Sequence, residues 1–233
     1  MKLAIMQPYF FPYIGYFQLI NAVDEFVIYD NIEFTKKGWI NRNRILVNGK
    51  DAVISLPLKK ASDFLNINQR YLSDTWPNDR IKLLNKINET YKKAPHFDTA
   101  YQLFERCLII DELNLFHFIH NSIKEILFFL DIKTKITISS NIYINHDLKS
   151  EEKVIEICKK QNTKLYINPI GGLELYSKNN FISNDINISF QKIGNVKYRQ
   201  FGNEFVPSLS ILDLLMFNTK SEIDNHLKNF TLI

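Results

Sequence analysis

The hydrophobic pattern of the first 30 residues predicts a strand, a helix and a second strand. Residues 3–6 form a short apolar run, and apolar residues recur at helical spacing from 15 to 23. Residues 25–29, with the sequence EFVIY, form a second apolar run. A strand, a helix and a strand in so short a segment form a βαβ unit, which favours a parallel sheet with a right-handed crossover.

A hairpin is expected in the segment that follows, within an insertion of about residues 32–75. Two strand-like runs, 39–47 and 50–58, flank the dipeptide Asn48-Gly49. This dipeptide between two such runs is a strong signal for a two-residue type I′ turn. We expect the hairpin to extend the sheet or to cover its edge.

The middle of the chain shows helical spacing, and the strand pattern returns after it. Apolar residues predict helices at 77–93, 97–107 and 113–130, within a helical block of about 77–131. A second βαβ unit should follow, with strands at 136–138 and 164–167 around a helix at about 150–160. A strand at 187–191 and helices at 210–217 and about 221–229 complete the expected elements, listed here in chain order.

The first turn of the helix expected at 150–160 mixes favourable and unfavourable residues. Ser150 suits the N-cap, and Glu151 and Glu152 suit the positive end of the helix dipole. Lys153 stands where a capping box would have an acid. Together these patterns predict one α/β domain over residues 1–233, built on a mostly parallel sheet of βαβ units with an inserted hairpin and a central helical block.

Composition narrows the classes of function. Hydrophobic residues make up 45% and charged residues 23% of the 233 residues, which is typical of a globular protein and excludes a disordered chain. A net charge of +4 is too small to indicate nucleic-acid binding but is compatible with an anionic small molecule. Cys107 and Cys158 are isolated, and no apolar run could span a bilayer, so we expect a cytoplasmic protein without membrane insertion. The oligomeric state is left open.

The loop after the first strand, MQPYFFPYIGY, is the first candidate binding site. Ligands bind where parallel strands end, and the free N–H groups of a helix N-terminus attract anions. Gln7 is its polar side chain, and Gly15 would allow a ligand or backbone to approach closely. We therefore name Gln7, Tyr13, Gly15 and Tyr16 as candidate substrate-binding residues. The alternative is that the aromatic rings only cover the core.

The basic segment from 33 to 44 is the second candidate. Alternation along a strand would place Arg42 and Arg44 on one face, as a fork for phosphate or carboxylate, and two amides on the other. Protection of a sheet edge by charged side chains explains the same pattern. The candidate substrate-binding residues in this segment are Lys36, Lys37, Trp39, Asn41, Arg42, Asn43 and Arg44.

Asp30 ends the second strand and is the candidate catalytic acid or base, although it could equally cap the loop. The pairs Ser139-Ser140 and Gly171-Gly172 follow the strands of the second βαβ unit. They could line a phosphate site, yet ordinary turn chemistry explains them as well. The histidines do not cluster, and no P-loop, dinucleotide or serine hydrolase motif is present, so we predict no metal site.

Several ordered segments resemble the WbqC-like protein family across nearly the whole chain. They are QPYFFPYIGYFQLI, DEFVIYDNIEFTKKGWINRNRI, ISSN, VIEICKKQNTKLYINPIGG and PSLSILDLLMFN. This resemblance implies bacterial genes of surface polysaccharide, especially O-antigen, in which amino sugars are made on nucleotide carriers. It implies a pathway and assigns no role to any residue.

A more distant likeness concerns the turn PYIGY and the helix after it. This region looks like the HxGH region of nucleotidyltransferases and adenylate-forming ligases, with Tyr13 and Tyr16 where the two histidines would stand. The likeness implies a nucleotidyltransferase-like or Rossmann-like sheet. A tyrosine is neutral near pH 7 and does not replace a cationic histidine at a phosphate chain.

The expected function is an enzyme that acts on a nucleotide-linked amino sugar, transferring an acyl or aminoacyl group to the sugar amine. Asp30 would take a proton from the attacking amine, and Arg42 and Arg44 would hold the diphosphate. One alternative is a nucleotidyltransferase or adenylate-forming ligase that uses ATP with Mg²⁺. The other is a non-catalytic protein that binds a nucleotide-linked sugar or another anionic small molecule.

Overall fold

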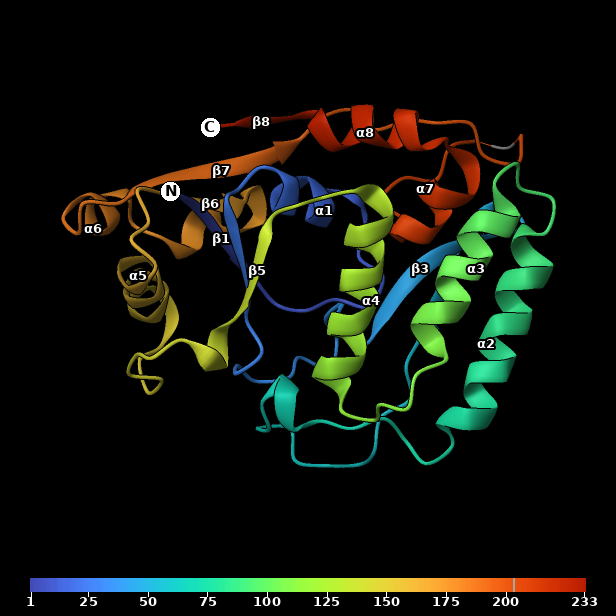
Figure 1. Cartoon of the computed structure of the whole chain (residues 1–233), viewed down its shortest axis with the longest axis horizontal. Helices are drawn as coiled ribbons and strands as arrows, with labels where there is room; N and C mark the ends of the chain where they lie inside the picture. Colours follow the sequence, from blue (N-terminus) through green and yellow to red (C-terminus); the bar gives the residue numbers. More distant parts are fainter. Residues whose placement is uncertain (203) are drawn as a thin grey trace.

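The computed structural model describes residues 1–202 and 204–233. In these residues a six-stranded sheet has the order β5-β2-β1-β6-β7-β8 (Figure 1). The first five strands in that order are parallel, and the edge strand β8 is antiparallel to β7. The bounds are β1 Lys2–Met6, β2 Glu25–Ile28, β5 Lys135–Ile138, β6 Leu165–Pro169, β7 Asn187–Ile193 and β8 Phe230–Leu232. The predicted α/β class with a mostly parallel sheet is confirmed.

Helices cover both faces of this sheet. Alternate strand residues such as Ala4 and Phe26 pack into a core that includes α1 (Ile14–Asn21) and α4 (Leu115–Leu130). The intervening residues, Leu3 and Val27 among them, pack on the other face. There the covering helices are α5 (Ser150–Lys160) and α6 (Lys178–Ile182), which lie together on one side of the sheet in Figure 1.

The hairpin forms as predicted but does not extend the sheet. Its strands, β3 (Arg42–Val47) and β4 (Lys50–Ser55), make a separate two-stranded antiparallel sheet. Asn48 and Gly49 have φ values of 50° and 76°, the left-handed backbone that a type I′ turn needs. Of the two alternatives, an extension of the sheet is wrong, because the hairpin packs against the loop after β1 and against α7 (Ile211–Phe217) instead of pairing with an edge strand.

The helical block agrees with the sequence pattern to within two residues at each end. It consists of α2 (Trp76–Tyr91), α3 (Phe97–Leu108) and α4. Helix α4 begins after Asn114, whose side chain accepts a hydrogen bond from the backbone of His117. After α7, helix α8 (Lys220–Lys228) packs against α1. Among the described residues no helix is long and apolar enough to cross a bilayer.

The second βαβ unit has parallel strands that are not neighbours. Strands β5 and β6 lie on opposite sides of the β2-β1 pair, so the connection through α5 crosses two strands. The expected cap of α5 is wrong: Lys149 holds the N-cap position, and Ser150, with φ 48°, makes no side-chain cap. Strand β8, helix α6 and the short 3₁₀ helices were not predicted. The 3₁₀ helices are η1 Ile67–Gln69, η2 Ser139–Asn141 and η3 Ile170–Leu175.

Candidate functional site: an aromatic cavity at the strand ends

A cavity of about 430 Å³ lies where β1, β6 and β7 end, at Met6, Pro169 and Ile193. We call it the strand-end cavity. Strand β1 stands between β2, the next sheet strand along the chain, and β6, which comes much later. In open α/β sheets ligands bind at the point where the strand order reverses in this way. The described residues that line it are Met6, Tyr9, Pro12, Tyr13, Gly15, Tyr16, Leu19, Trp39, Asn43, Arg44, Pro169, Ile193 and Ser208.

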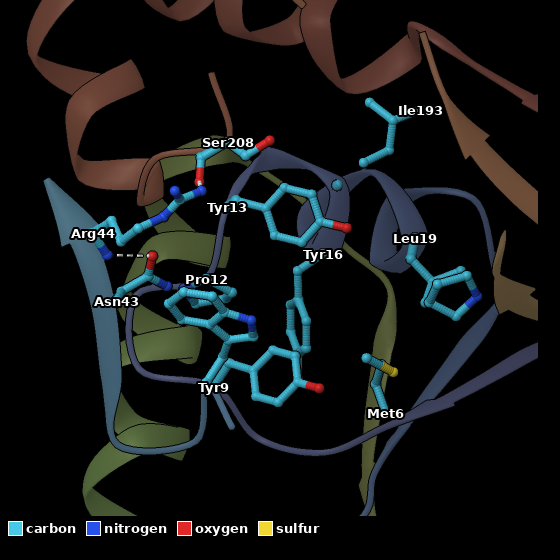
Figure 2. A pocket seen from close by; sticks show the side chains of 13 residues that line it. Met6, Tyr9, Pro12, Tyr13, Tyr16, Leu19, Asn43, Arg44, Ile193 and Ser208 are labelled. Atoms are coloured by element: carbon cyan, nitrogen blue, oxygen red, sulfur yellow. Dashed lines mark hydrogen bonds between the residues drawn. The ribbon is translucent and has the colours of Figure 1, made fainter. Parts of the chain in front are cut away.

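The loop between β1 and α1 divides its aromatic rings between the core and this cavity. Phe10 and Phe11 are fully buried, and the Phe11 ring packs 4.9 Å from that of Phe104. Tyr9, Tyr13 and Tyr16 line the cavity instead, between Arg44 and Met6 in Figure 2. The idea that the rings only cover the core therefore describes the phenylalanines, while Tyr9 and Tyr13 face the cavity and Tyr16 belongs to both the core and the cavity wall.

Hydrogen bonds from other elements fix the strained backbone of this loop. Phe11 has φ 43°, which is rare for a bulky residue. The Asn43 amide donates to the carbonyls of Phe10 and Phe11 at 3.1 and 2.9 Å. The Ser210 hydroxyl donates to the Phe11 carbonyl at 2.8 Å. Strand β3 and the start of α7 thus hold the loop in a conformation that turns the tyrosines towards the cavity.

The three tyrosines are neutral hydroxyl groups in this setting. Burial raises the pKa of Tyr9, Tyr13 and Tyr16, with a smaller contribution from neighbouring tyrosines for Tyr9 and Tyr16. The rings of Tyr9 and Tyr16 lie 5.7 Å apart, and the Tyr16 hydroxyl donates to the Gln7 carbonyl at 3.1 Å. The cavity therefore offers polar hydroxyls and aromatic faces without negative charge from tyrosine.

Arg44 brings a positive charge to the cavity wall. Its Nη1 donates to Asp51 Oδ2 at 3.1 Å, and its Nη2 donates to the Ser208 carbonyl at 3.2 Å. The buried Nε has no hydrogen-bond partner among the described residues. The guanidinium carbon lies 5.6 Å from the centre of the Trp39 ring. Arg44 is thus held at the wall, with one N–H donor that has no partner among the described residues.

Arg42 shares the Trp39 ring with Arg44 but has a different set of contacts. Its guanidinium carbon lies 5.4 Å from the ring centre. Its Nε donates to the Gly38 carbonyl at 2.8 Å, and its Nη2 donates to the Lys37 carbonyl. Arg42 thereby holds the turn before β3, and it does not line the strand-end cavity. The predicted arginine pair is on one face, with Arg44 at the cavity.

Four other candidates of the first two segments lie outside the cavity lining. Asn41 donates to the Leu56 carbonyl at 2.9 Å and so helps to close the hairpin. Lys36 forms an exposed ion pair with Asp63, and Lys37 is exposed. Gln7 is half-buried, and its backbone carbonyl accepts the Tyr16 hydroxyl. Binding roles for these side chains stay predictions.

Asp30 is buried at the other end of the same sheet edge. Its Oδ1 accepts the backbone N–H of Ser140 at 2.9 Å, and its Oδ2 accepts the Asn68 amide at 2.8 Å. The carboxylate therefore joins the end of β2 to η2 and η1, and it does not line the cavity. The Ser139 hydroxyl donates to the side chain of Asn31. A role for Asp30 as base, and for the serine pair in phosphate binding, stays a prediction.

A buried lysine, Lys153, lies beside Asp30 and was not predicted as a site residue. Lys153 Nζ donates to the His146 carbonyl at 3.2 Å and to that of Asn31 at 3.5 Å, and it lies 5.2 Å from the centre of the Tyr29 ring. Burial lowers the pKa of Lys153, while the Asp30 charge acts in the opposite direction. The signal in the sequence was its unusual place in the first turn of a helix.

The glycine pair after β6 falls in η3 and does not line the cavity. A Cβ on Gly172 would overlap the Asn168 amide, so a larger residue would have to displace that side chain, whereas Gly171 has open space around it. The lining residues that were not predicted from the sequence are Met6, Tyr9, Pro12, Leu19, Pro169, Ile193 and Ser208. Ser208 has φ 56°, a left-handed backbone that its sequence does not indicate.

Among residues 1–202 and 204–233 no cluster of three or more histidines, cysteines or carboxylates could hold a metal ion.

Comparison with known proteins decides the family. The WbqC-like protein family matches residues 7–225. The chain belongs to the WbqC-like protein family. This WbqC-like protein is also 31% identical over 231 residues to Uncharacterized protein Rv1507c of Mycobacterium tuberculosis, with 97% of each chain covered. No solved structure matches the chain significantly. The resemblance seen in the motifs is confirmed, and the matched range contains the cavity lining except Met6.

Proposed function

We propose that this WbqC-like protein is an enzyme of bacterial surface-polysaccharide biosynthesis, in particular of O-antigen. In this proposal the strand-end cavity binds a nucleotide-linked amino sugar, and the enzyme transfers an acyl or aminoacyl group to the sugar amine. The observation that carries the proposal is a cavity with aromatic walls and one guanidinium at the reversal point of a parallel sheet. Family membership suggests the pathway, and the cavity chemistry suggests the kind of ligand.

The aromatic walls suit a nucleotide-linked sugar. Tyr9, Tyr13, Tyr16 and Trp39 bring flat apolar faces together with hydroxyl and indole donors. Bases stack on such rings, and stacking contributes about 1–3 kcal/mol per base. Neutral hydroxyl groups can bond to the hydroxyls of a sugar without a cost in charge burial. A volume of about 430 Å³ is within the usual range of small-molecule sites.

Arg44 suits the diphosphate of such a ligand. Its unpartnered Nε and the adjacent Nη atoms form the planar fork that binds phosphate oxygens in pairs. The ion pair with Asp51 is partly exposed and is worth about 1 kcal/mol or less. The diphosphate as a whole carries more negative charge than the Asp51 carboxylate and can replace it as the partner of Arg44.

The strand-end cavity is suited to orienting the substrates rather than to transferring protons between them and the protein. Among the described lining residues there is no aspartate, glutamate, histidine or cysteine. Asp30 receives no role in this proposal, because both of its oxygens already accept hydrogen bonds away from the cavity. The enzyme would hold a free sugar amine against an activated acyl carbonyl, and such positioning can supply a large part of a rate enhancement.

The strand order supports the finer assignment of a Rossmann-like fold. When the hairpin is left out, the five parallel strands are numbered 3-2-1-4-5 across the sheet. This is the order of the doubly wound sheets that bind nucleotides at the reversal point. The strand-end cavity lies beside strand 1 of that order, where a nucleotide would be expected.

The test is a transfer assay with a binding assay beside it. Purified protein would be incubated with thymidine- or uridine-diphosphate-linked amino sugars and acyl or aminoacyl donors, and products would be followed by mass spectrometry. We expect an N-acylated sugar nucleotide, and we expect Arg44→Ala to weaken sugar-nucleotide binding at least tenfold. The control Lys36→Ala changes an exposed cation outside the cavity and should leave binding unchanged.

Two results would contradict the proposal in different ways. Binding of the sugar nucleotide without a product for any donor would make the protein a binding protein and would remove the transferase activity. Absence of binding, or equal losses for Arg44→Ala and Lys36→Ala, would remove the strand-end cavity as the site.

A further inference from the structure

A second cavity adjoins the strand-end cavity. It has a volume of about 260 Å³, and the two cavities share the lining residues Tyr13, Ile193 and Ser208. These three residues come from the loop before α1, the end of β7 and the segment before α7. Figure 2 shows them at the upper side of the strand-end cavity. The two cavities therefore meet at a wall formed by these three residues.

The beginning of α1 lies at this wall. Ile14 lines the second cavity, and the next residue, Gly15, lines the strand-end cavity. A Cβ on Gly15 would lie 2.4 Å from Ile193 Cδ1 and 2.6 Å from Tyr13 Cε2. The wall is thus closely packed because position 15 has no side chain.

Ser208 connects the wall to the charged side of the strand-end cavity. Its backbone has φ 56°, a conformation that costs free energy for a residue other than glycine. In this conformation its carbonyl accepts the hydrogen bond from Arg44 Nη2. The strained residue therefore lies between the proposed diphosphate ligand and the second cavity.

The second cavity differs from the first in its chemistry. Its described lining residues include no acidic, basic or histidine side chain. Apolar side chains form most of the wall, among them Val196, Leu209 and Leu214. The Tyr198 hydroxyl donates to Asp213 at 2.7 Å, so it is already bonded within the protein. Such a cavity favours an uncharged, mainly apolar group.

We propose that the second cavity binds the acyl group of an acyl thioester, the donor for the proposed transfer. Its volume is below the usual range of about 300–1,000 Å³ for whole small-molecule ligands, so it suits a short acyl chain more than a complete donor. This inference rests on the proposed function, because it assigns the sugar amine to the first cavity and the acyl group to the second.

The reaction takes place where the two cavities meet, and it is an aminolysis. The nitrogen lone pair of the sugar amine attacks the thioester carbonyl carbon, and a carbon–nitrogen bond forms. The carbon–sulfur bond then breaks, and the thiolate leaves with the bonding electrons. The proton lost by the amine balances the thiolate, so the products are an amide and a free thiol. No oxidant, reductant or nucleotide hydrolysis is needed.

The experiment uses butyryl-N-acetylcysteamine thioester as the acyl probe and a thymidine-diphosphate-linked amino sugar as the second ligand. Both dissociation constants would be measured by calorimetry for the wild-type protein, for Val196→Trp and for Lys197→Trp. Val196 is half-buried in the second cavity, and its neighbour Lys197 is exposed and lines neither cavity. We expect Val196→Trp to weaken thioester binding at least tenfold and to leave sugar-nucleotide binding within twofold, with no effect of Lys197→Trp.

A competition measurement on the wild-type protein makes the inference testable even if Val196→Trp fails to fold. We expect saturation with the sugar nucleotide to leave the Kd of the thioester unchanged or lowered, because the two ligands occupy different cavities. Mutual exclusion, absence of thioester binding, or equal effects of the two tryptophan variants would overturn the inference. Thioester binding that depends on Val196 without sugar-nucleotide binding would remove the proposed function and keep the acyl site.

Discussion

A single added methyl group at Gly15 tests how tightly the wall between the two cavities is packed. In Gly15→Ala the new Cβ must displace both the Tyr13 ring and the Ile193 side chain. We expect sugar-nucleotide binding to weaken at least fivefold, while the free energy of unfolding changes by about 1 kcal/mol or less because alanine favours the helix. Calorimetry and denaturant unfolding would measure the two quantities.

Gly171→Ala is the matched control, because no atom lies within 4 Å of its added Cβ. It should bind like the wild-type protein. Equal binding by Gly15→Ala would show that the Tyr13 ring can move without loss and would contradict the role given to the wall.

His120 should make stability depend on pH in mildly acidic solution. Burial, followed by the charges of Lys124 and His117, lowers its pKa from 6.5 to about 4, while Asp30 acts in the opposite direction. Between these two values the unfolded chain binds more protons than the folded one, so stability is present above pH 6.5 and is lost as the pH falls through 4. The loss should be about 2 kcal/mol for this partly exposed group.

His120→Phe checks this prediction, because phenylalanine keeps the stacking on Phe116 and removes the titration. Chemical unfolding at a series of pH values should show a smaller stability loss between pH 6.5 and 4 than in the wild-type protein. His96→Gln removes a histidine that is not among the groups acting on His120, and it serves as the control. An identical loss in His120→Phe and the wild-type protein would rule out His120 as the source.

The same scale shows what a sequence can say about individual side chains. Alternation correctly placed Arg42 and Arg44 on one face, since both lie near the Trp39 ring. Alternation did not show that the Arg42 guanidinium would donate to the carbonyls of Lys37 and Gly38. Those hydrogen bonds depend on the conformation of the turn before β3. The Phe11 ring points into the core and the neighbouring tyrosines face the cavity because Phe11 has a left-handed backbone, for which the sequence has no signal.

At the scale of elements, β3 determines the shape of the loop between β1 and α1. Asn43 on β3 is buried, and its side-chain amide donates to the carbonyls of Phe10 and Phe11 in this loop. Among the described residues no other side-chain amide donates to these two carbonyls. Asn43→Leu should reduce the free energy of unfolding by about 2–3 kcal/mol, because it leaves the Phe10 carbonyl without its donor and the Phe11 carbonyl with the Ser210 hydroxyl alone. It should also weaken ligand binding by changing the positions of the tyrosines.

Asn41→Leu is the control on the same hairpin, since Asn41 is half-buried and donates to one carbonyl. It should cost about 1 kcal/mol and leave binding unchanged. Denaturant unfolding and calorimetry provide both readings. A cost for Asn43→Leu no larger than that for Asn41→Leu would show that β3 does not hold the loop.

Helices and strands were predictable where the periodic pattern of hydrophobic residues was long or pronounced. The three helices of the central block and the strands β1, β2 and β7 agree with the pattern. Strand β8 was missed because it is three residues long and largely exposed, with no alternation to mark it. The separation of the hairpin from the sheet was also missed, because strand pairing depends on tertiary contacts that the local pattern does not contain.

At the scale of the whole molecule, the carboxyl edge of the sheet has two distinct ends. The ends of β1, β6 and β7 surround the strand-end cavity. The ends of β2 and β5 lie beside Asp30 and Lys153, whose polar atoms form hydrogen bonds within the protein. The sequence predicted parallel strands and a site in the first loop. It did not predict the strand order, because the order depends on how α5 crosses two strands, and so it combined both ends in one expected site.

A crystal structure of the protein with a thymidine-diphosphate-linked amino sugar tests the central claim most directly. The account predicts the ligand in the strand-end cavity, stacked against Tyr9, Tyr13 or Trp39. It predicts phosphate oxygens about 3 Å from the guanidinium nitrogens of Arg44, with the Asp51 ion pair released. A ligand bound at the Asp30 and Lys153 end of the sheet, or a cavity left empty at saturating ligand, would contradict the account.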